Sequence, residues 1–206
     1  MKQKLAGIIF ISTLIFVVLL PVAAQFISMN NVGHRVYNII RNNKIIGNLT
    51  VSSIKKNNQL FVRNEAKFNI QMVGSFAATA IATNTFRENT LMHATVQRTL
   101  NGKVKTDNEI KFNSGKYQVV KGKSSQEIKR VINYTVSSLF FIEPANVSEV
   151  FSEVYLQFLK VKKLAPAVYE TNLPDGGLMT YTYHSGMLTN VVAKTNYATV
   201  QYQLKK

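Results

Sequence analysis

The side chains that most often do chemistry are scarce in this sequence. Its 206 residues include three histidines and no cysteine. The histidines, His34, His93 and His184, stand far apart and lack the HxH or HExxH spacing that places two imidazoles on one metal ion. We therefore expect no metal centre and no catalytic role for any of the three histidines.

Other catalytic constellations are missing as well. A serine hydrolase would need a GxSxG turn, and Gly74-Ser75 lacks the second glycine. A glycosidase would need two converging carboxyl groups, and only ten Asp and Glu residues exist. Gly176-Gly177 follows Pro174-Asp175 and is typical of a hairpin turn, not of a phosphate-binding loop. The sequence thus predicts a protein that is not an enzyme and that uses no cofactor.

The amino terminus has the pattern of a secretory signal. Lys2 and Lys4 precede an uncharged, largely apolar run from Leu5 to Ala24 that ends in Pro21-Val22-Ala23-Ala24. We expect residues 1–24 to be a signal peptide cleaved after Ala24; an uncleaved membrane anchor is the alternative. The remaining residues, 25–206, are expected to form one β-rich domain without a further membrane span, exported to the periplasm or secreted.

The charge of the chain restricts its partners. The net charge is +15, which favours anionic neighbours such as lipopolysaccharide, acidic polysaccharide or acidic lipid. The basic residues occur in ones and twos, as at Lys55-Lys56, Lys129-Arg130 and Lys162-Lys163, and this spread disfavours nucleic acid as the partner. A purely solubilising surface charge is the alternative.

Most of the chain has the period of antiparallel strands. From Lys103 to Phe112 every odd position is charged and the even positions are uncharged, and Leu60–Met72 alternates in the same manner. Turns rich in Asn and Gly separate the runs, including Asn42-Asn43, Asn101-Gly102 and Ser185-Gly186. The pattern predicts consecutive hairpins, among them strands at 166–172, 178–184, 187–195 and 196–204.

Two segments depart from this alternation. Val147, Val150, Phe151 and Val154 follow the i, i+3, i+4, i+7 spacing of one helix stripe, which predicts a short helix near 145–156. Val73–Phe86 carries no charge and many small side chains, which indicates either a strand buried on both faces or the wall of a ligand site. If a ligand binds there, the expected lining residues are Phe76, Ile81, Phe86, Val147, Val150, Phe151 and Val154.

Several short motifs carry a resemblance to a known family. They are Phe-Phe-Ile-Glu-Pro at 140–144, Val-Phe-Ser-Glu at 150–153, Leu-Pro-Asp-Gly-Gly at 173–177 and Tyr-Thr-Tyr-His-Ser-Gly at 181–186. With them the chain resembles a family of small exported bacterial proteins of unknown function, seen mainly in Bacteroidetes-type genomes. The resemblance implies an exported antiparallel β domain without a known active site. The inferred shape is similar to the open half-barrels of lipoprotein carriers, which is an analogy of fold alone.

These observations predict a mostly β protein: a strongly curved antiparallel sheet or open half-barrel of roughly ten strands with one short helix across its concave side. The leading hypothesis is a non-enzymatic envelope protein that holds a lipid or another apolar ligand on the concave face. The alternative is an interaction module that binds an anionic envelope component or a partner protein through its basic surface. If Val147, Val150 and Phe151 fill the interior, the ligand hypothesis fails.

Overall fold

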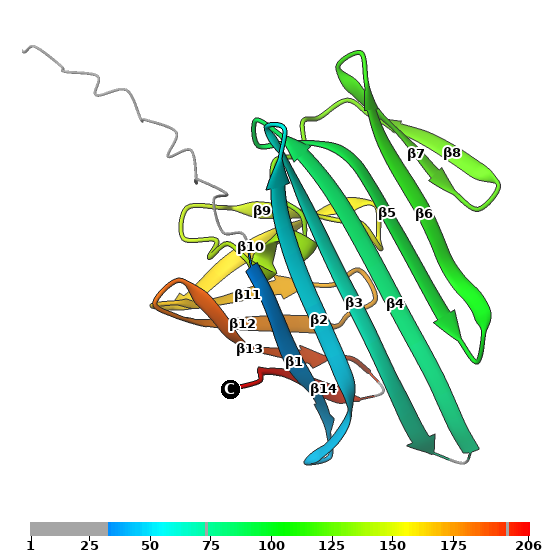
Figure 1. Cartoon of the computed structure of the whole chain (residues 1–206), viewed down its shortest axis with the longest axis vertical. Coiled ribbons are helices and arrows are strands. Elements are labelled where there is room, and N and C mark those ends of the chain that lie inside the picture. Colours follow the sequence, from blue (N-terminus) through cyan, green and yellow to red (C-terminus); the bar gives the residue numbers. More distant parts are fainter. Residues whose placement is uncertain (1–32, 73, 197) are drawn as a thin grey trace, which may run out of the picture.

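The computed structural model describes residues 33–72, 74–196 and 198–206, so the predicted signal peptide lies outside the described residues. The described chain forms strands joined by short turns, with one turn of 3-10 helix, η1 (Figure 1). In chain order the elements are β1 (Gly33–Arg41), β2 (Lys44–Lys56), β3 (Gln59–Met72), β4 (Gly74–Arg87), β5 (Thr90–Leu100), β6 (Lys103–Asn113), β7 (Lys116–Lys121), β8 (Ser124–Ile128), η1 (Ser137–Phe140), β9 (Glu149–Ser152), β10 (Gln157–Ala165), β11 (Val168–Asn172), β12 (Leu178–His184), β13 (Met187–Lys194) and β14 (Thr199–Leu204).

All fourteen strands of the described chain belong to one antiparallel sheet, in the order β8-β7-β6-β5-β4-β3-β2-β1-β14-β13-β12-β11-β10-β9. The first strand pairs with both β2 and the last strand, β14, so the two ends of the described chain meet in the middle of the sheet. In Figure 1 the strands β10 to β13 run across the long strands β2 to β6, which shows how strongly the sheet bends. The outermost strands, β8 and β9, do not pair with each other, so the half-barrel stays open.

Alternation divides the sheet into an inner and an outer face. The inner face carries apolar side chains such as Tyr37, Val51, Val62, Phe86 and Ile110, each at most 2% exposed. The outer face is largely polar, since the charged residues of β3 and β6 occupy the positions between the apolar ones. This arrangement is the one expected when an antiparallel sheet packs a single face against a core.

The turns follow the sequence signals closely. Asn42-Asn43, Asn57-Asn58, Asn101-Gly102 and Ser185-Gly186 all have positive φ at both residues, as two-residue hairpin turns require. The turn at Glu88-Asn89 has φ values of 49° and 63° and was not expected, because Glu is rarely placed in such a turn.

The predicted single curved antiparallel sheet is confirmed, but the expected number of roughly ten strands is too low. The predicted strand 178–184 coincides with β12, and the runs Leu60–Met72 and Lys103–Phe112 lie within β3 and β6. The additional strands include β9 and β10, which occupy the region where a helix was predicted.

The helix predicted near 145–156 is wrong. Residues 149–152 form β9, and a turn leads from it into β10. Phe151 bonds through its backbone N–H to Tyr134 and through its carbonyl to Val136, so its polar groups find partners outside any helix. Its neighbours on both sides include the β-branched Val150 and the poor helix former Ser152, which favour an extended strand once such partners exist. The only helical turn in the described chain is η1, which lies earlier.

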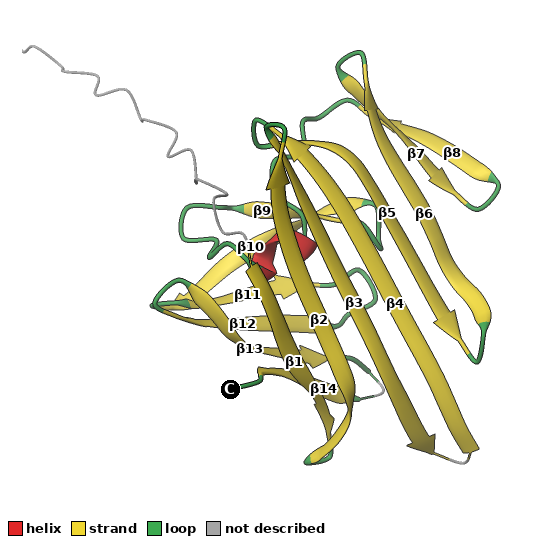
Figure 2. Cartoon of the chain, viewed as in Figure 1, coloured by secondary structure: helices red, strands yellow, loops and turns green. Residues whose placement is uncertain are grey.

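The inner segment, residues 129–148, connects β8 to β9. These two strands are the opposite edges of the sheet, and the segment joins them across the inner face. Its central residues, from Leu139 to Ile142, are at most 6% exposed and belong to the core. Figure 2 shows η1, in red, lying among the strands and not outside them. No helix of the described chain is long and apolar enough to cross a membrane.

Candidate functional site

The residues expected to line a ligand site are mostly part of the packed core. Val150 and Phe151 are 0% exposed and Phe86 is 1% exposed. Val147 is partly buried and packs against the core, and Val154 is partly buried in the turn after β9. The structure therefore joins Phe86, Val150 and Phe151 in one core cluster with the inner segment and leaves them no surface for a ligand.

Phe76 and Ile81 are separated by the alternation of β4. Phe76 has the parity of the inner-face residues Ala78 and Phe86, and it is partly buried. Ile81 has the parity of Thr79 and Thr83, whose hydroxyls bond across to β5 on the outer face. A single site cannot hold both side chains, because neighbouring residues of a strand point to opposite faces.

The inner segment is held by hydrogen bonds from both halves of the sheet. Tyr183 Oη on β12 donates to the carbonyls of Leu139 at 2.8 Å and Ile142 at 3.3 Å. Arg35 Nη1 on β1 donates to the carbonyl of Phe140 at 2.7 Å. These side chains satisfy backbone groups that would otherwise be buried without partners, so the inner segment is a fixed part of the fold.

Side chains of β7 and β3 hold the inner segment by hydrogen bonds as well. Tyr117 Oη on β7 accepts from the backbone N–H of Ile132 at 3.1 Å, and Asn64 Nδ2 on β3 donates to the carbonyl of Ser137 at 3.3 Å. Burial raises the pKa of Tyr117 and, more strongly, that of Tyr183, so both hydroxyls stay protonated at neutral pH.

A polar cluster around Glu153 lies inside the molecule. Glu153 is 2% exposed, and its Oε1 accepts from Asn84 Nδ2 at 3.1 Å and from the backbone N–H of Ser137 at 3.3 Å. Asn108 Nδ2 donates to the backbone carbonyls of Glu153 and Val154. Each amide nitrogen faces an acceptor, which fixes the orientation of the side-chain amides. The Oδ1 atoms of Asn64, Asn84 and Asn108 have no hydrogen-bond partner among the described residues.

Part of the inner face remains partly exposed. We call it the open section. Its walls are formed by apolar residues from both halves of the sheet, each partly buried and packed against the core: Phe68, Ala80, Met179, Val200 and Tyr202. The strand register pairs Phe68 with Gly47, Gly47 with Ile39, and Ile39 with Tyr202. These pairs form one continuous row across the sheet, and the row joins the two walls.

Arg98 lies on this inner face. It pairs in register with Ala80, while its neighbour Thr99 bonds to Thr79 on the outer face. Burial raises the pKa of Tyr155 and of Tyr202, and the positive charge of Arg98 opposes that rise in both. The pKa of Asp175 is lowered first by the Tyr155 hydroxyl, and the charge of Arg98 adds to that lowering. The alternation Ala94, Val96, Arg98 was the available sequence signal: a charge at an otherwise apolar parity of β5.

A hydrogen bond joins the turn after β9 to the turn between β11 and β12. Tyr155 Oη donates to Asp175 Oδ2 at 2.6 Å, and the backbone N–H of Gly177 donates to Asp175 Oδ1 at 3.1 Å. Burial and the Asp175 carboxylate raise the pKa of Tyr155 to about 12, and the Tyr155 hydroxyl in turn holds the pKa of Asp175 below its ordinary value. The Asp175 carboxylate is thus already engaged by two donors.

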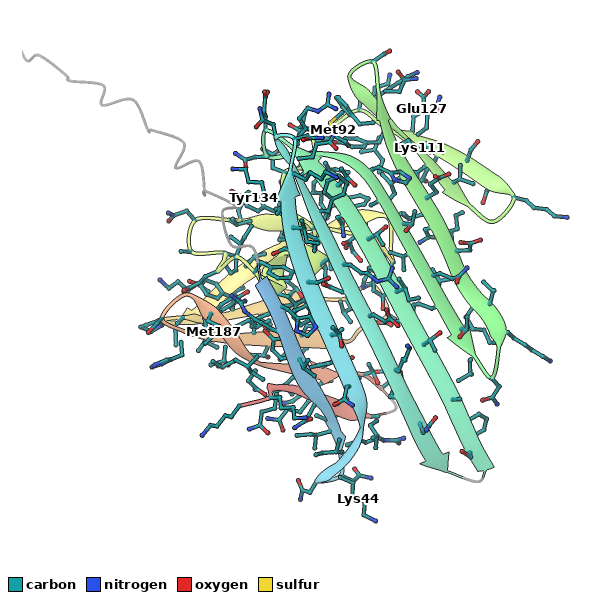
Figure 3. The ribbon with its side chains drawn as sticks, in the orientation of Figure 1. Lys44, Met92, Lys111, Glu127, Tyr134 and Met187 are labelled. Carbon is teal, nitrogen blue, oxygen red and sulfur yellow. The ribbon has the colours of Figure 1, made fainter. Side chains whose placement is uncertain are left out.

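The outer surface carries most of the charge. Glu65 pairs with Arg63 and Lys67, and hydrogen bonds from Lys111 and then His93 hold the pKa of Glu109 below its ordinary value. Figure 3 labels Lys111 and Glu127 on the part of the sheet formed by β6 to β8. Several exposed lysines make no ion pair within the described chain: Lys103, Lys105, Lys121, Lys123, Lys160, Lys162 and Lys163.

The histidines remain apart in the structure. His93 lies 2.9 Å from Glu109 on the outer face, and His34 and His184 are exposed on β1 and β12. Among the described residues, no three His, Asp or Glu side chains gather where a metal ion could bind.

Comparisons with known proteins place the chain in a family. It is similar to the crystal structure of a beta-barrel-like protein of domain of unknown function DUF1849 from Brucella abortus, with a TM-score of 0.58 and 10% identity over 85% of this chain and 96% of that one. At this identity the likeness concerns the fold alone. No curated protein matches the chain. Residues 37–205, which include the inner segment and both walls of the open section, match the model described as Domain of unknown function (DUF6134), and the protein therefore belongs to the DUF6134 family.

Proposed function

We propose that the protein is a non-enzymatic, exported envelope protein that binds an apolar ligand at the open section. The observation that carries the proposal is the set of partly exposed apolar side chains on the inner face, contributed by both halves of a curved sheet. Apolar surface of this kind, with polar groups at its rim, is the usual composition of small-ligand sites. The expected likeness to lipoprotein carriers and the Bacteroidetes-type origin stay predictions.

The proposed site differs from the one expected from the sequence. Val150 and Phe151 fill the interior beside the inner segment, so the ligand site expected there from the sequence fails, and the proposal concerns the open section instead. Ile81 is excluded by its position on the outer face. Phe76 lies on the inner face of β4, the strand that contributes Ala80 to the proposed site.

Binding of a neutral, apolar fluorescent probe, N-phenylnaphthylamine, tests the proposal. We expect its fluorescence to rise with the wild-type protein and its affinity to fall about fivefold in Val200→Gln, which places an amide among the apolar walls. Val120→Gln is the matched control, because Val120 is 42% exposed on β7 and far from the open section in strand order. No binding by the wild type would overturn the function, and equal effects of the two substitutions would overturn its location.

A second function is favoured by the unpaired lysines. Lys160 and Lys162 lie two residues apart on β10 and therefore share one face of the strand. Both are exposed and make no ion pair in the described chain, so they can contact an anionic envelope polymer. We expect Lys160→Gln with Lys162→Gln to weaken binding to an acidic polysaccharide and to reduce its salt dependence. The paired Lys116, 2.5 Å from Glu127, gives the control substitution, and unchanged binding in the double variant would reject this function.

A further inference from the structure

We propose that the ligand of the open section is an amphiphile with one anionic head group, and that Arg98 binds that head group. The proposal rests on the proposed function and names the class of ligand that the site would take. The proposal follows from the position of Arg98 on the inner face, next to the apolar residues of the open section.

The position of Arg98 is fixed by the register of β4 and β5. Ala80 lies directly opposite Arg98, and the next inner-face residue along β5, Val96, is 3% exposed. Arg98 itself is exposed and therefore stands where the buried part of the inner face ends. A head group bound to Arg98 would have its tail beside Ala80 and the rest of the open section.

Arg98 has no ion-pair partner among the described residues. It has no hydrogen bond there either. The carboxylate of Asp175, whose pKa is lowered chiefly by the Tyr155 hydroxyl and also by the charge of Arg98, accepts from Tyr155 and Gly177 and forms no ion pair with Arg98. Arg35, also on the inner face, is used differently, because it donates to the carbonyl of Phe140.

The opposite wall supplies a hydroxyl donor for the same head group. Tyr202 pairs with Ile39 and Val191, both core residues, so its ring faces inward. Burial raises the pKa of Tyr202, and the positive charge of Arg98 opposes that rise. Its hydroxyl has no hydrogen-bond partner within the described residues and can donate to an anion.

The chemistry of the site therefore matches a single carboxylate or phosphate joined to an apolar chain. A guanidinium and a phenol hydroxyl together offer several donors to an oxyanion. The apolar residues Phe68, Met179 and Val200 offer no donors and suit a hydrocarbon. A polyanion would leave its further charges without cationic partners at this apolar section, which favours a monoanionic ligand.

Displacement of N-phenylnaphthylamine by dodecanoate and by dodecanol tests the inference. With the wild-type protein we expect dodecanoate to bind more tightly than dodecanol. Arg98→Gln should weaken dodecanoate about tenfold to a hundredfold and leave dodecanol unchanged, because only the anion uses the charge-assisted contact. Arg98→Lys should restore part of the affinity, and Tyr202→Phe should weaken dodecanoate by a smaller factor.

Arg87→Gln is the control, since Arg87 is exposed at the end of β4 on the outer-face parity. Equal loss in the Arg87 and Arg98 variants would show general charge attraction and overturn the inference. Equal binding of dodecanoate and dodecanol, with no effect of Arg98→Gln, would also overturn it while leaving the proposed function intact. Binding of neither compound, together with no binding of the fluorescent probe, would reject both.

Discussion

Asn84 on β4 donates from Nδ2 to Oε1 of Glu153 at 3.1 Å, and this bond links a central strand to the turn that follows the edge strand β9. Both side chains are at most 2% exposed. The pair lies 69 residues apart in sequence and joins the two halves of the bent sheet inside the molecule. Polar contacts, as well as apolar packing, thus hold the interior closed around the inner segment.

The first prediction concerns this pair. Asn84→Leu removes the donor and leaves the buried carboxyl of Glu153 with fewer partners, which should lower the free energy of unfolding by about 1–3 kcal/mol. Urea unfolding measures the loss. Gln97→Leu, on an exposed position of β5, is the control and should change stability little. Equal stability of the Asn84 variant and the wild type would contradict the role of the bond.

The second prediction tests whether the interior around Phe151 is tightly packed or opens for a ligand. Phe151 is 0% exposed and its ring packs edge-on against Phe158, with 5.3 Å between the centroids. Phe151→Ala should therefore cost about 3–5 kcal/mol and lower the melting temperature markedly. Val131→Ala, at a position that is 50% exposed, should have a small effect. A small loss in Phe151→Ala with stronger probe binding would indicate that the interior opens for ligand.

The third prediction uses two glycines. A Cβ at Gly47 would lie 2.1 Å from the carbonyl oxygen of Lys67 and 2.5 Å from Cβ of Phe68, whereas a Cβ at Gly33 would meet nothing within 4 Å. Gly47→Ala should destabilise the protein by about 1–3 kcal/mol through overpacking, and Gly33→Ala should not. Because Gly47 lies beside Phe68, the first variant should also weaken probe binding. Thermal unfolding of the two variants makes the comparison, and equal melting temperatures would refute it.

The fourth prediction concerns alkaline pH. Burial, and then the hydrogen bond from its hydroxyl to Glu143 at 2.8 Å, raise the pKa of Tyr169 to about 12. The folded protein therefore holds this proton more tightly than the unfolded chain, whose tyrosine has a pKa near 10. The resulting stability is fully present below pH 10 and is lost as the pH rises from about 10 to about 12.

Tyrosinate absorbance and unfolding at several pH values check this prediction. Tyr169→Phe should lose less stability than the wild type between about pH 10 and 12. Glu143→Gln should lower the pKa of Tyr169, because it removes the nearby negative charge. If the two variants had the alkaline unfolding profile of the wild type, the assignment to Tyr169 would fail.

The sequence by itself determined many of the strands and turns of this protein. Alternation along Leu60–Met72 and Lys103–Phe112 placed the apolar residues on one face, and that period is a local property of the chain. Asn and Gly marked the hairpins because the turns need positive φ, which those residues adopt at low cost. The absence of familiar catalytic motifs was visible at the same level.

The tertiary structure decided the rest. The spacing of Val147, Val150, Phe151 and Val154 is compatible with a helix or with a short strand and turn, and backbone partners at Tyr134 and Val136 selected the strand. Those partners became available because the inner segment joins the opposite edges β8 and β9 across the inner face. The pairing of β1 with β14, between the two ends of the described chain, places Tyr202 opposite Ile39 and joins the two halves of the sheet, a relationship that no local pattern encodes.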